Sequence, residues 1–432
     1  MLQFRNNRLL SIINKSTLSS SSYTSSIFSY CTCSSKKQQQ TNDDSTTITS
    51  TTSLKTKKNL IGLSKEEIET QFETLGLEKY RAKQVWKWIY NKGTKNIDHI
   101  DNLSKKHRDI LSEVYNIDHG VVNKDSLSID GTRKLLVEFK GDEVETVFIP
   151  ERNRGTLCIS SQVGCTFQCT FCHTGTQKLV RNLTAGEIVS QVFTARSLMH
   201  DFGPTTNKRL LTNVVLMGQG EPLYNYRNVS KALKILTDGE GISISKSKIT
   251  LSTSGVVPLI ERLGQDFPGI GLAISLHASN NKTRSEIVPI NQQWPIEELV
   301  QACINFTQKY TKDRITIEYV MLKGINDAKQ DAYNLIQLAS QFPSLINLIP
   351  FNPWPGTIYE CTPIDQIESF ARILERGGLK VTVRQPRGTD ILAACGQLVS
   401  SSQKKKGIII PEQEGEVIKK DLPLKSSYLN NV

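Results

Sequence analysis

The feature that most constrains the fold is an alternation of short apolar segments with amphipathic helical segments between residues 153 and 400. The candidate strands are 156–163, 213–217, 248–252, 271–277, 315–321, 346–351 and 380–384. Helical periodicity covers segments between them, including 185–200, 227–238, 296–310, 327–342 and 365–377. Strands that alternate with helices favour crossover connections and a parallel sheet. We predict an α/β fold with a partial or open parallel (β/α) barrel, because six or seven units fall at or below the eight of a full barrel.

Three cysteines follow the first candidate strand: Cys165, Cys169 and Cys172, at spacings of four and three. Thiolates are the usual ligands of iron–sulfur clusters, and a [4Fe–4S] cube with three local ligands keeps one iron open. The known use of such an open iron is to bind S-adenosylmethionine and to cleave it to a 5′-deoxyadenosyl radical. Two other interpretations remain: a zinc knuckle with His173 as fourth ligand, or three unrelated buried thiols. A zinc site normally brings two separated ligand pairs, and no second pair follows this loop.

Charge and composition indicate a globular enzyme with an anionic partner. The net charge is +11, and residues 79–108 carry nine Lys or Arg against two Asp, which predicts a basic face. Nucleic acid is the leading candidate partner, although a solvated helical surface explains the same pattern. Nine cysteines are too few for a disulfide scaffold in a chain of this length. No apolar run approaches the ~18–20 residues that a membrane-spanning helix needs.

The chain divides into five predicted parts. Residues 1–59 have a basic, Ser-rich start with no acidic residue before Asp43, which is typical of a mitochondrial transit peptide; a plain disordered tail is the alternative. Residues 60–118 are predicted to form a small helical accessory domain. Residues 119–152 are predicted to form a small antiparallel β lead-in, residues 153–400 the barrel, and residues 401–432 a C-terminal tail.

Within the predicted helical domain, Ser64 and Glu67 have the spacing of a capping box. Val85, Trp88 and Ile89 share one helical face and are expected to be core residues. Lys83 and Lys87, at positions i and i+4, are more plausible contacts for phosphate groups. In the β lead-in, turns are expected at Gly131 and at Gly141.

Clusters of residues with polar members end or directly follow several of the candidate strands, at the edge of the sheet where the cysteine loop also falls. They are Gly220 and Glu221 in the turn after 213–217, Ser252, the run Ser275, Leu276 and His277, and Asn352. Two isolated cysteines, Cys158 and Cys395, fall near the same edge, although burial as small apolar side chains is the ordinary state of a free cysteine. Cys303 and Cys361 receive no role.

Residues 61–400 resemble the RlmN-type family of radical S-adenosylmethionine enzymes, which methylate C2 of adenine in RNA. The resemblance rests on residues 158–165, 218–222, 251–258, 275–278, 287–291, 346–353 and 394–398. It implies a partial barrel of the radical S-adenosylmethionine type with one [4Fe–4S] cluster per chain, held by Cys165, Cys169 and Cys172. It also implies that S-adenosylmethionine is bound by Gly220, Glu221, Ser252, Ser275, Leu276, His277 and Asn352.

The resemblance further implies a role for three residues outside the cluster loop. Cys395 would be methylated by one S-adenosylmethionine, and the radical from a second would activate the S-methyl group so that its carbon adds to C2 of adenine. Glu145 matches the position proposed to remove the C2 proton. Cys158 would then attack the sulfur of Cys395, forming a disulfide bond and releasing methyladenine.

The resemblance leaves several alternatives open. A related enzyme type methylates C8 of adenine with similar thiols, and a non-catalytic zinc protein that binds RNA would explain the charge and the cysteine loop. The substrate would be ribosomal RNA, tRNA or both, and an electron donor such as flavodoxin or ferredoxin is expected. We expect a monomer with no membrane association, located in mitochondria or, as the alternative, in the cytoplasm.

Overall fold

The computed structural model describes residues 57–203 and 209–399. The proposed transit peptide, apart from residues 57–59, and the C-terminal tail lie outside the described residues.

A ten-stranded sheet organises the structure, with the strand order β14-β13-β12-β11-β10-β9-β6-β5-β4-β3. The seven strands from β14 to β6 in that order are mutually parallel. In chain order they are β6 (Arg154–Cys158), β9 (Asn213–Leu216), β10 (Ile249–Thr253), β11 (Gly271–Ser275), β12 (Ile315–Met321), β13 (Ser344–Pro350) and β14 (Lys380–Val383). Each strand lies beside the next one along the chain, and the sheet ends at β14 without closing. The prediction of an open parallel barrel is therefore confirmed.

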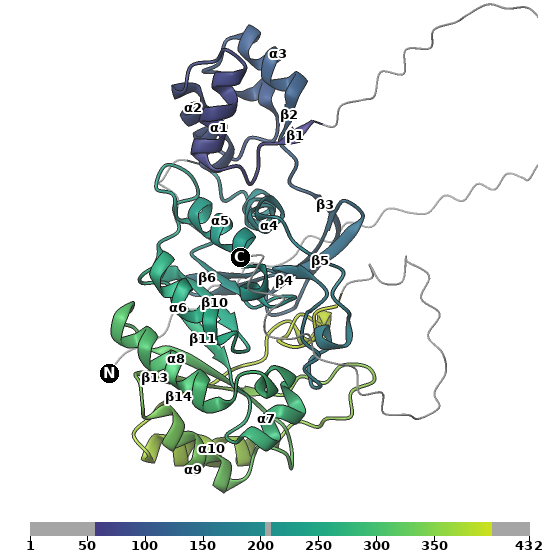
Figure 1. Ribbon diagram of the computed structural model, residues 1–432. Helices are drawn as coiled ribbons and strands as arrows, with labels where there is room; N and C mark the ends of the chain where they lie inside the picture. The colour runs from purple at the N-terminus through teal and green to yellow at the C-terminus, as the bar shows by residue number, and fades with distance from the viewer. Residues whose placement is uncertain (1–56, 204–208, 400–432) are drawn as a thin grey trace, which may run out of the picture. The chain divides into compact units, whose positions relative to one another are not determined.

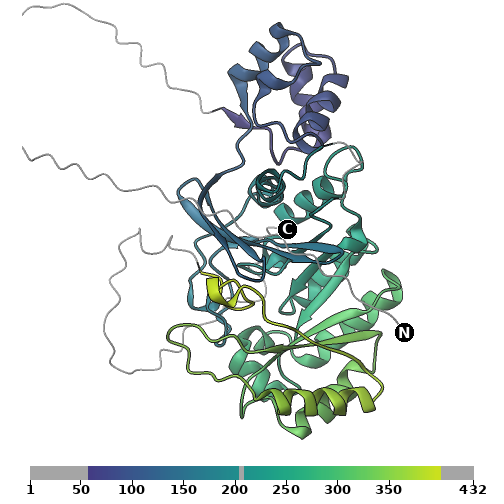
Figure 2. The ribbon, with the colours of Figure 1, turned by 180° about the vertical axis from the view of Figure 1, so that it is seen from behind.

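Helices connect successive parallel strands and lie along the outside of the sheet (Figures 1 and 2). They are α4 (Ala185–Leu198), α5 (Tyr226–Thr237), α6 (Val257–Asp266), α7 (Asn281–Ile287), α8 (Ile296–Lys309), α9 (Lys329–Ala339) and α10 (Ile364–Arg376). Helix α10 is a representative case, because it buries Ile367, Phe370, Ala371 and Leu374, which recur at the spacing of one helical face.

The first predicted strand is shorter than its apolar pattern indicated. Strand β6 ends at Cys158, and residues 162–163 form a separate short strand, β7 (Gln162–Val163), that pairs with β8 (Arg181–Asn182). Ser160 explains the break, because its backbone N–H donates to Oε1 of Gln191 at 2.8 Å and its hydroxyl donates to the carbonyl of Glu145 at 2.7 Å. These bonds take the place of the strand ladder at this point.

Three antiparallel strands extend the same sheet beyond β6: β3 (Val121–Leu127), β4 (Arg133–Phe139) and β5 (Asp142–Glu151). Gly131 and Gly141 have φ values of +83° and +85° in the turns, as glycine allows. The register places Val147 of β5 opposite Cys158 of β6. The predicted β lead-in is thus continuous with the barrel sheet.

The N-terminal helices are α1 (Lys65–Thr74), α2 (Tyr80–Tyr90) and α3 (Lys105–Val114), and the short strands β1 (Lys58–Asn59) and β2 (Tyr115–Asn116) pair beside them. The Ser64–Glu67 capping box is present as predicted. Val85 and Ile89 are buried as expected, but the fully buried tryptophan of α2 is Trp86, and Trp88 is only half-buried. Nε1 of Trp86 donates to Oδ1 of Asp238 at 3.0 Å, a partner from the distant segment after α5.

The two lysines predicted to contact phosphate instead face a carboxylate of the same chain. Nζ of Lys83 lies 2.6 Å and Nζ of Lys87 lies 3.6 Å from Oε1 of Glu240. Lys65 adds ion pairs of 2.9 Å to both Asp238 and Glu240. The segment after α5 therefore neutralises part of the basic face of α2.

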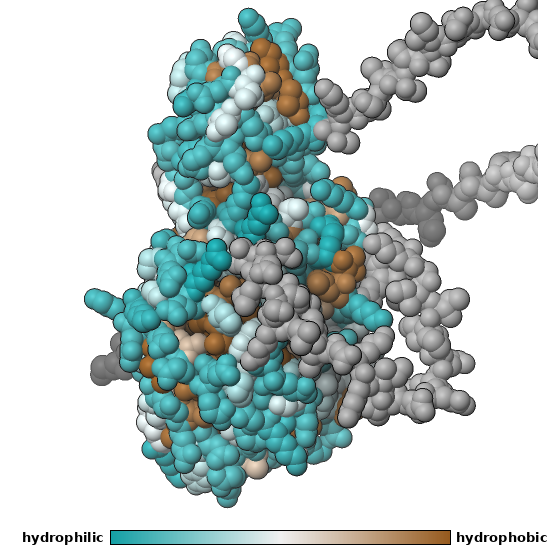
Figure 3. Space-filling view, viewed as in Figure 1, coloured by the Kyte–Doolittle hydropathy of each residue, from teal (hydrophilic) through white to brown (hydrophobic). Residues whose placement is uncertain are grey.

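Most buried apolar side chains form one continuous cluster that extends from Leu60 to Leu374, so the N-terminal helices share a core with the barrel. On the face seen in Figure 3, hydrophilic residues predominate and hydrophobic residues gather only in small patches. Within residues 57–203 and 209–399, no helix is both long and apolar enough to cross a membrane.

Asp238→Ala should lower the free energy of unfolding by about 1–3 kcal/mol, because it leaves the buried N–H of Trp86 without an acceptor. Glu360→Ala is the matched control, because it removes an exposed ion pair with Lys323 and should change stability by less than about 1 kcal/mol. Urea denaturation followed by tryptophan fluorescence measures both. Equal effects of the two substitutions would show that the Asp238–Trp86 hydrogen bond contributes no more to the free energy of unfolding than an exposed ion pair does.

Candidate active site

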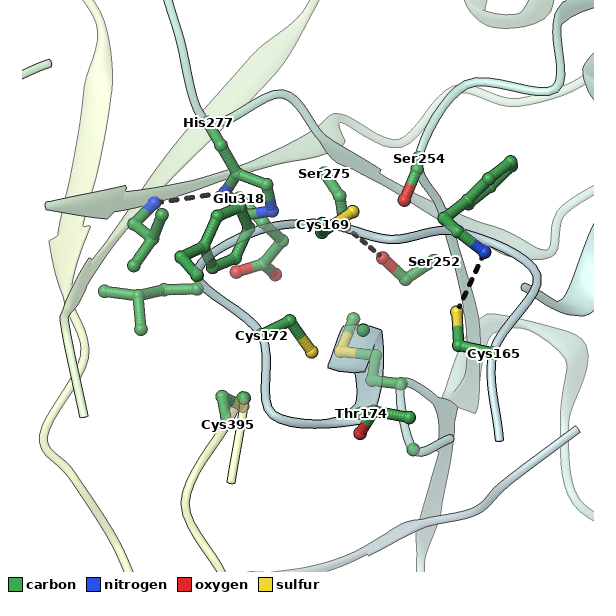
Figure 4. A pocket seen from close by; sticks show the side chains of 18 of the residues that line it. Cys165, Cys169, Cys172, Thr174, Ser252, Ser254, Ser275, His277, Glu318 and Cys395 are labelled. Atoms are coloured by element: carbon green, nitrogen blue, oxygen red, sulfur yellow. Dashed lines mark hydrogen bonds between the residues drawn. The ribbon is translucent and has the colours of Figure 1, made fainter. Parts of the chain in front are cut away.

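A cavity opens at the carboxyl ends of the parallel strands and encloses about 1020 Å³, including space that is open to solvent. The three cysteines of the predicted cluster loop line it, together with residues that follow β9, β10, β11 and β13 (Figure 4). Of the predicted cofactor-binding residues, the cavity is lined by Gly220, Glu221, Ser252, Ser275, His277 and Asn352. The sheet therefore brings together residues that lie as far apart in the chain as Cys165 and Asn352.

Two aromatic residues anchor the cysteine loop. Phe167 packs against Tyr224 with ring centroids 5.2 Å apart, and Phe171 meets the ring of His277 edge-on at 4.8 Å. Gly164 precedes the loop with a φ of +77°, and a Cβ atom there would lie 2.2 Å from the carbonyl oxygen of Lys178. The two phenylalanines and the three cysteines of the loop all line the cavity, so the aromatic contacts hold the loop in place at its wall.

The thiols of the loop are held in a setting that favours their neutral form unless a cation is present. Burial raises the pKa of Cys165 to about 12, and burial together with the neighbouring thiols also raises the pKa of Cys169. Among the residues that the structure describes, no group of three or more His, Cys, Asp or Glu side chains is arranged to hold a single metal ion. An iron–sulfur cube spaces its ligands more widely, because each thiolate binds a different iron. Three thiols facing one cavity fit such a cluster.

Hydrogen bonds fix the polar residues around the cavity. Nδ1 of His277 accepts from the backbone N–H of Val320 at 3.1 Å, and burial lowers the pKa of this imidazole to about 3, so it is neutral. His277 also has a φ of +58°, a backbone conformation that residues other than glycine rarely adopt. The hydroxyls of Ser252 and Ser275 lie 3.3 Å apart.

Glu221 is buried at the cavity wall. Its carboxylate accepts the backbone N–H groups of Leu223 at 3.0 Å and Ser254 at 2.9 Å. Burial raises the pKa of Glu221 to about 7, against the effect of these hydrogen bonds. A ligand with an ammonium group would place a positive charge beside this carboxyl group and favour its ionised form.

Leu276 is the one predicted cofactor-binding residue that does not line the cavity. Its side chain is buried in the core, its N–H donates to the carbonyl of Glu318 at 3.1 Å, and its carbonyl accepts from Nε of Arg284 at 3.0 Å. The structure thus gives this residue contacts through its backbone, and its side chain packs away from the site.

Cys395 belongs to the segment after β14 and reaches the same cavity beside Cys172 (Figure 4). Nδ2 of Asn352 donates to the carbonyl of Cys395 at 3.2 Å, and the N–H of His173 donates to the carbonyl of Gly396 at 2.8 Å. Cys158 lies next to it, since both thiols line a smaller adjoining cavity.

The disulfide bond that the resemblance predicted is not present. Each of the seven cysteines within residues 57–203 and 209–399 is a free thiol, including Cys158 and Cys395. The structure therefore holds these two residues in their reduced form.

Glu145 is buried beside the segment that carries Cys395 and lines neither cavity. Its carboxylate lies 2.8 Å from Nζ of Lys134 and accepts the backbone N–H of Val399 at 2.7 Å. Burial raises the pKa of Glu145, and the positive charge of Lys134 opposes that effect. Lys134 also donates to the carbonyl of Leu392 at 3.0 Å, so it joins the carboxylate to the Cys395 segment.

Sequence reasoning missed three residues of this region. Lys134 is one of them, and Gln219 is another, because its Oε1 accepts the backbone N–H of Glu145 at 3.1 Å. Arg384 is the third, because it lines both cavities. Its position directly after the last strand would have identified it, by the same argument that identified the other polar residues at strand ends.

Comparisons with known proteins agree with this architecture. Residues 58–117 match the ribosomal RNA large subunit methyltransferase N-terminal domain, and residues 159–336 match the radical SAM superfamily. The dual-specificity RNA methyltransferase RlmN of Parvibaculum lavamentivorans is 50% identical over 369 residues, covering 82% of this chain and 92% of the relative. The protein of the same name from Rhodospirillum rubrum is 52% identical over 350 residues, covering 81% of this chain and 82% of the relative.

Comparison with a solved structure supports the same assignment at the level of the fold. The crystal structure of a radical SAM methyltransferase from Sphaerobacter thermophilus is 38% identical, with a TM-score of 0.75, and covers 79% of this chain and 99% of the other. Sequence, fold and the arrangement of the cysteine loop lead to the same assignment. This chain belongs to the RlmN family of dual-specificity RNA methyltransferases, within the radical SAM superfamily.

Proposed function

We propose that this chain methylates C2 of adenine in RNA, with Cys395 as the residue that carries the methyl group. The observation that carries the proposal is the position of Cys395, which lines the same cavity as Cys165, Cys169 and Cys172 although it comes from a separate segment. Ribosomal RNA and tRNA are both proposed substrates, in line with the dual specificity in the names of the relatives.

The chemistry of the base explains why a cysteine is needed. C2 of adenine is electron-poor, so it does not attack the methyl group of a sulfonium directly. A cysteine thiolate is a strong nucleophile and accepts that methyl group instead. Cys395 has the required access, because it opens into the cavity that the proposed S-adenosylmethionine residues line.

The three loop cysteines would hold the [4Fe–4S] cluster, and Gly220, Glu221, Ser252, Ser275, His277 and Asn352 would hold S-adenosylmethionine. When bound, the cluster and cofactor would supply the radical chemistry that activates the methyl group on Cys395 for addition to C2. For Leu276 the structure supports a contact through the backbone only. An electron donor of the flavodoxin or ferredoxin kind would supply the reducing electron.

Glu145 is proposed to accept the proton that leaves C2. Burial raises the pKa of Glu145, and its pairing with Lys134 opposes that effect by favouring the ionised carboxylate, which is the form that accepts a proton. Cys158 is proposed to complete the reaction by attacking the sulfur of Cys395 and displacing the methylated base. The free thiols in the structure are the state from which such a turnover starts.

We further propose that residues 60–118 form a domain that contacts RNA phosphates, with 119–152 and 153–400 as the β lead-in and the barrel. Lys83 and Lys87 form ion pairs with Glu240. The remaining basic residues of 79–108 are therefore the better candidates for contacts with RNA phosphates. A monomer is the proposed functional form.

Anaerobically purified protein should contain about four iron atoms per chain, as one [4Fe–4S] cube requires. Cys172→Ala should lose the cluster and the cleavage of S-adenosylmethionine, whereas Cys303→Ala, a buried thiol of helix α8, should keep both. Iron and sulfide analysis with product detection provides the measurement. Stoichiometric zinc in a colourless wild-type protein would favour the alternative of a zinc protein that binds RNA.

The two thiols outside the loop should give opposite phenotypes. Cys395→Ala removes the methyl acceptor, so RNA stays free and unmodified. Cys158→Ala should accumulate a covalent protein–RNA adduct, seen as a ribonuclease-sensitive band on a denaturing gel. The adduct should be absent from the Cys158→Ala, Cys395→Ala double variant. Equal partial losses of activity without an adduct would instead show that both thiols only pack the core, where each change costs about 1–3 kcal/mol.

The first 59 residues are proposed to direct the chain to mitochondria and to be dispensable for catalysis, because their start is basic and free of acidic residues. Fusion of residues 1–59 to a fluorescent protein should give a mitochondrial signal, and the chain without them should remain active. A diffuse cytoplasmic signal would contradict the targeting and favour the cytoplasm.

A further inference from the structure

Cys158 lies where a thiol resists ionisation. It is 8% exposed and packs in a small apolar cluster with Val147, Ala393 and Leu398. Burial, together with the neighbouring thiol of Cys395, raises the pKa of Cys158 to about 12, and the positive charge of Arg384 opposes that rise. The proposed reaction needs this residue as a nucleophile, and only the thiolate is an effective one. A thiol in these surroundings therefore needs a positive charge nearby.

Arg384 provides the cation at this point of the fold. It directly follows β14. Its backbone N–H donates to the carbonyl of Leu348 at 2.8 Å, and this bond fixes the backbone from which the side chain extends. Its side chain lines the small cavity with Cys158 and Cys395, and it also lines the main cavity. Within the described residues, no carboxylate lies at ion-pair distance from its guanidinium. The other arginine of the small cavity, Arg387, instead lies 3.8 Å from Oδ2 of Asp130.

The charged groups that act on Cys158 come from three elements. Arg384, after β14, and the backbone N–H of Met217, after β9, both favour the thiolate. Cys395, from the segment after β14, disfavours it when Cys395 itself is ionised. Arg384 is thus the one side-chain cation that acts on Cys158 within the described residues.

We propose that Arg384 is a positioning residue that stabilises the thiolate of Cys158 in the step in which Cys158 attacks Cys395. The inference rests on the proposed function and deepens it. Once the sulfur of Cys395 carries the methylene-linked base, that sulfur is a neutral thioether and no longer competes for the positive charge. Glu318 and Glu151 still share the positive charge of Arg384 with Cys158, but the competing thiolate of Cys395 is gone, so the second thiol becomes more nucleophilic after the first has been used.

The step itself balances with a proton from solvent as its one additional reactant. A lone pair of the Cys158 thiolate forms a bond to the sulfur of Cys395, and the bond between that sulfur and the methylene carbon breaks. The electron pair of the broken bond goes to the carbon, which takes a proton from solvent and becomes the methyl group. The two sulfurs are oxidised and the carbon is reduced, and an external dithiol returns both cysteines to the reduced state.

The first test measures the ionisation of Cys158 directly. In full-length, anaerobically purified Cys395→Ser protein, the rate at which iodoacetamide alkylates Cys158 is followed against pH by peptide mass spectrometry. Arg384→Gln should lower that rate at pH 8 by about tenfold or more, which corresponds to a pKa rise of at least one unit, and the rate should recover at higher pH. Arg384→Lys should keep most of the rate, because it keeps the charge.

Arg387→Gln is the matched control, since it removes a cation from the same cavity that does not act on Cys158, and its profile should equal that of the parent. Arg384→Met serves as a second neutral variant should the Gln variant fail to fold, with iron content as the check of integrity. Coincident profiles for all variants would overturn the inference. An equal shift for Arg387→Gln would also overturn it, because the effect would then not belong to Arg384.

The second test uses RNA. Arg384→Gln in the otherwise unchanged chain should accumulate the same protein–RNA adduct as Cys158→Ala, and raising the pH should relieve it in Arg384→Gln only. An adduct in Cys158→Ala but not in Arg384→Gln contradicts the role of Arg384 and leaves the proposed function standing. No adduct in either variant contradicts the proposed function, while the alkylation profiles still decide whether Arg384 ionises Cys158.

Discussion

The anchoring of the segment that carries Cys395 beside the cysteine loop is the interaction on which the rest of the site depends. Asp390 accepts the hydroxyl of Ser128 at 2.6 Å, and Asp130 accepts the N–H of Gly388 at 3.0 Å, so the turn between β3 and β4 holds one end of the segment. Glu145 accepts the N–H of Val399 and holds the other end. The antiparallel strands therefore do more than extend the sheet, because they place a thiol from the end of the described chain over the ends of the parallel strands.

The same region concentrates buried charged groups, each with its own compensating partners. Lys134 compensates Glu145, and Arg384 stands beside two thiols, while Arg284 is fully buried among the carbonyls of Ser254, Ser275 and Leu276. Burying ionisable groups opposes folding unless hydrogen bonds or opposite charges compensate them. Buried ionisable groups gathered at one edge of a sheet are typical of a functional site. The apolar core in the rest of the molecule then provides most of the stability of the fold.

Much of the fold was accessible from the sequence, because hydrophobic periodicity reports which face of a segment is buried. It identified the parallel strands, the crossover helices and the capping box at Ser64, and the strand-end argument brought Glu221, Ser275 and Asn352 to one cavity. Periodicity does not report partners from distant parts of the chain. The bonds of Ser160 that end β6, the carboxylate of Glu240 that faces α2, and the inward side chain of Leu276 all depend on such partners. Arg384 was within reach of the same strand-end argument.

The central claim is that the methyl group reaches adenine through Cys395 as a bridging carbon. Incubation of substrate RNA with the enzyme and S-adenosylmethionine that carries a fully deuterated methyl group tests it, with nucleoside mass spectrometry as the readout. Because one deuterium is lost to the radical and the last hydrogen comes from solvent, the account predicts 2-methyladenosine that retains two deuterium atoms. A product that retains all three would contradict it, because the methyl group would then have been transferred intact.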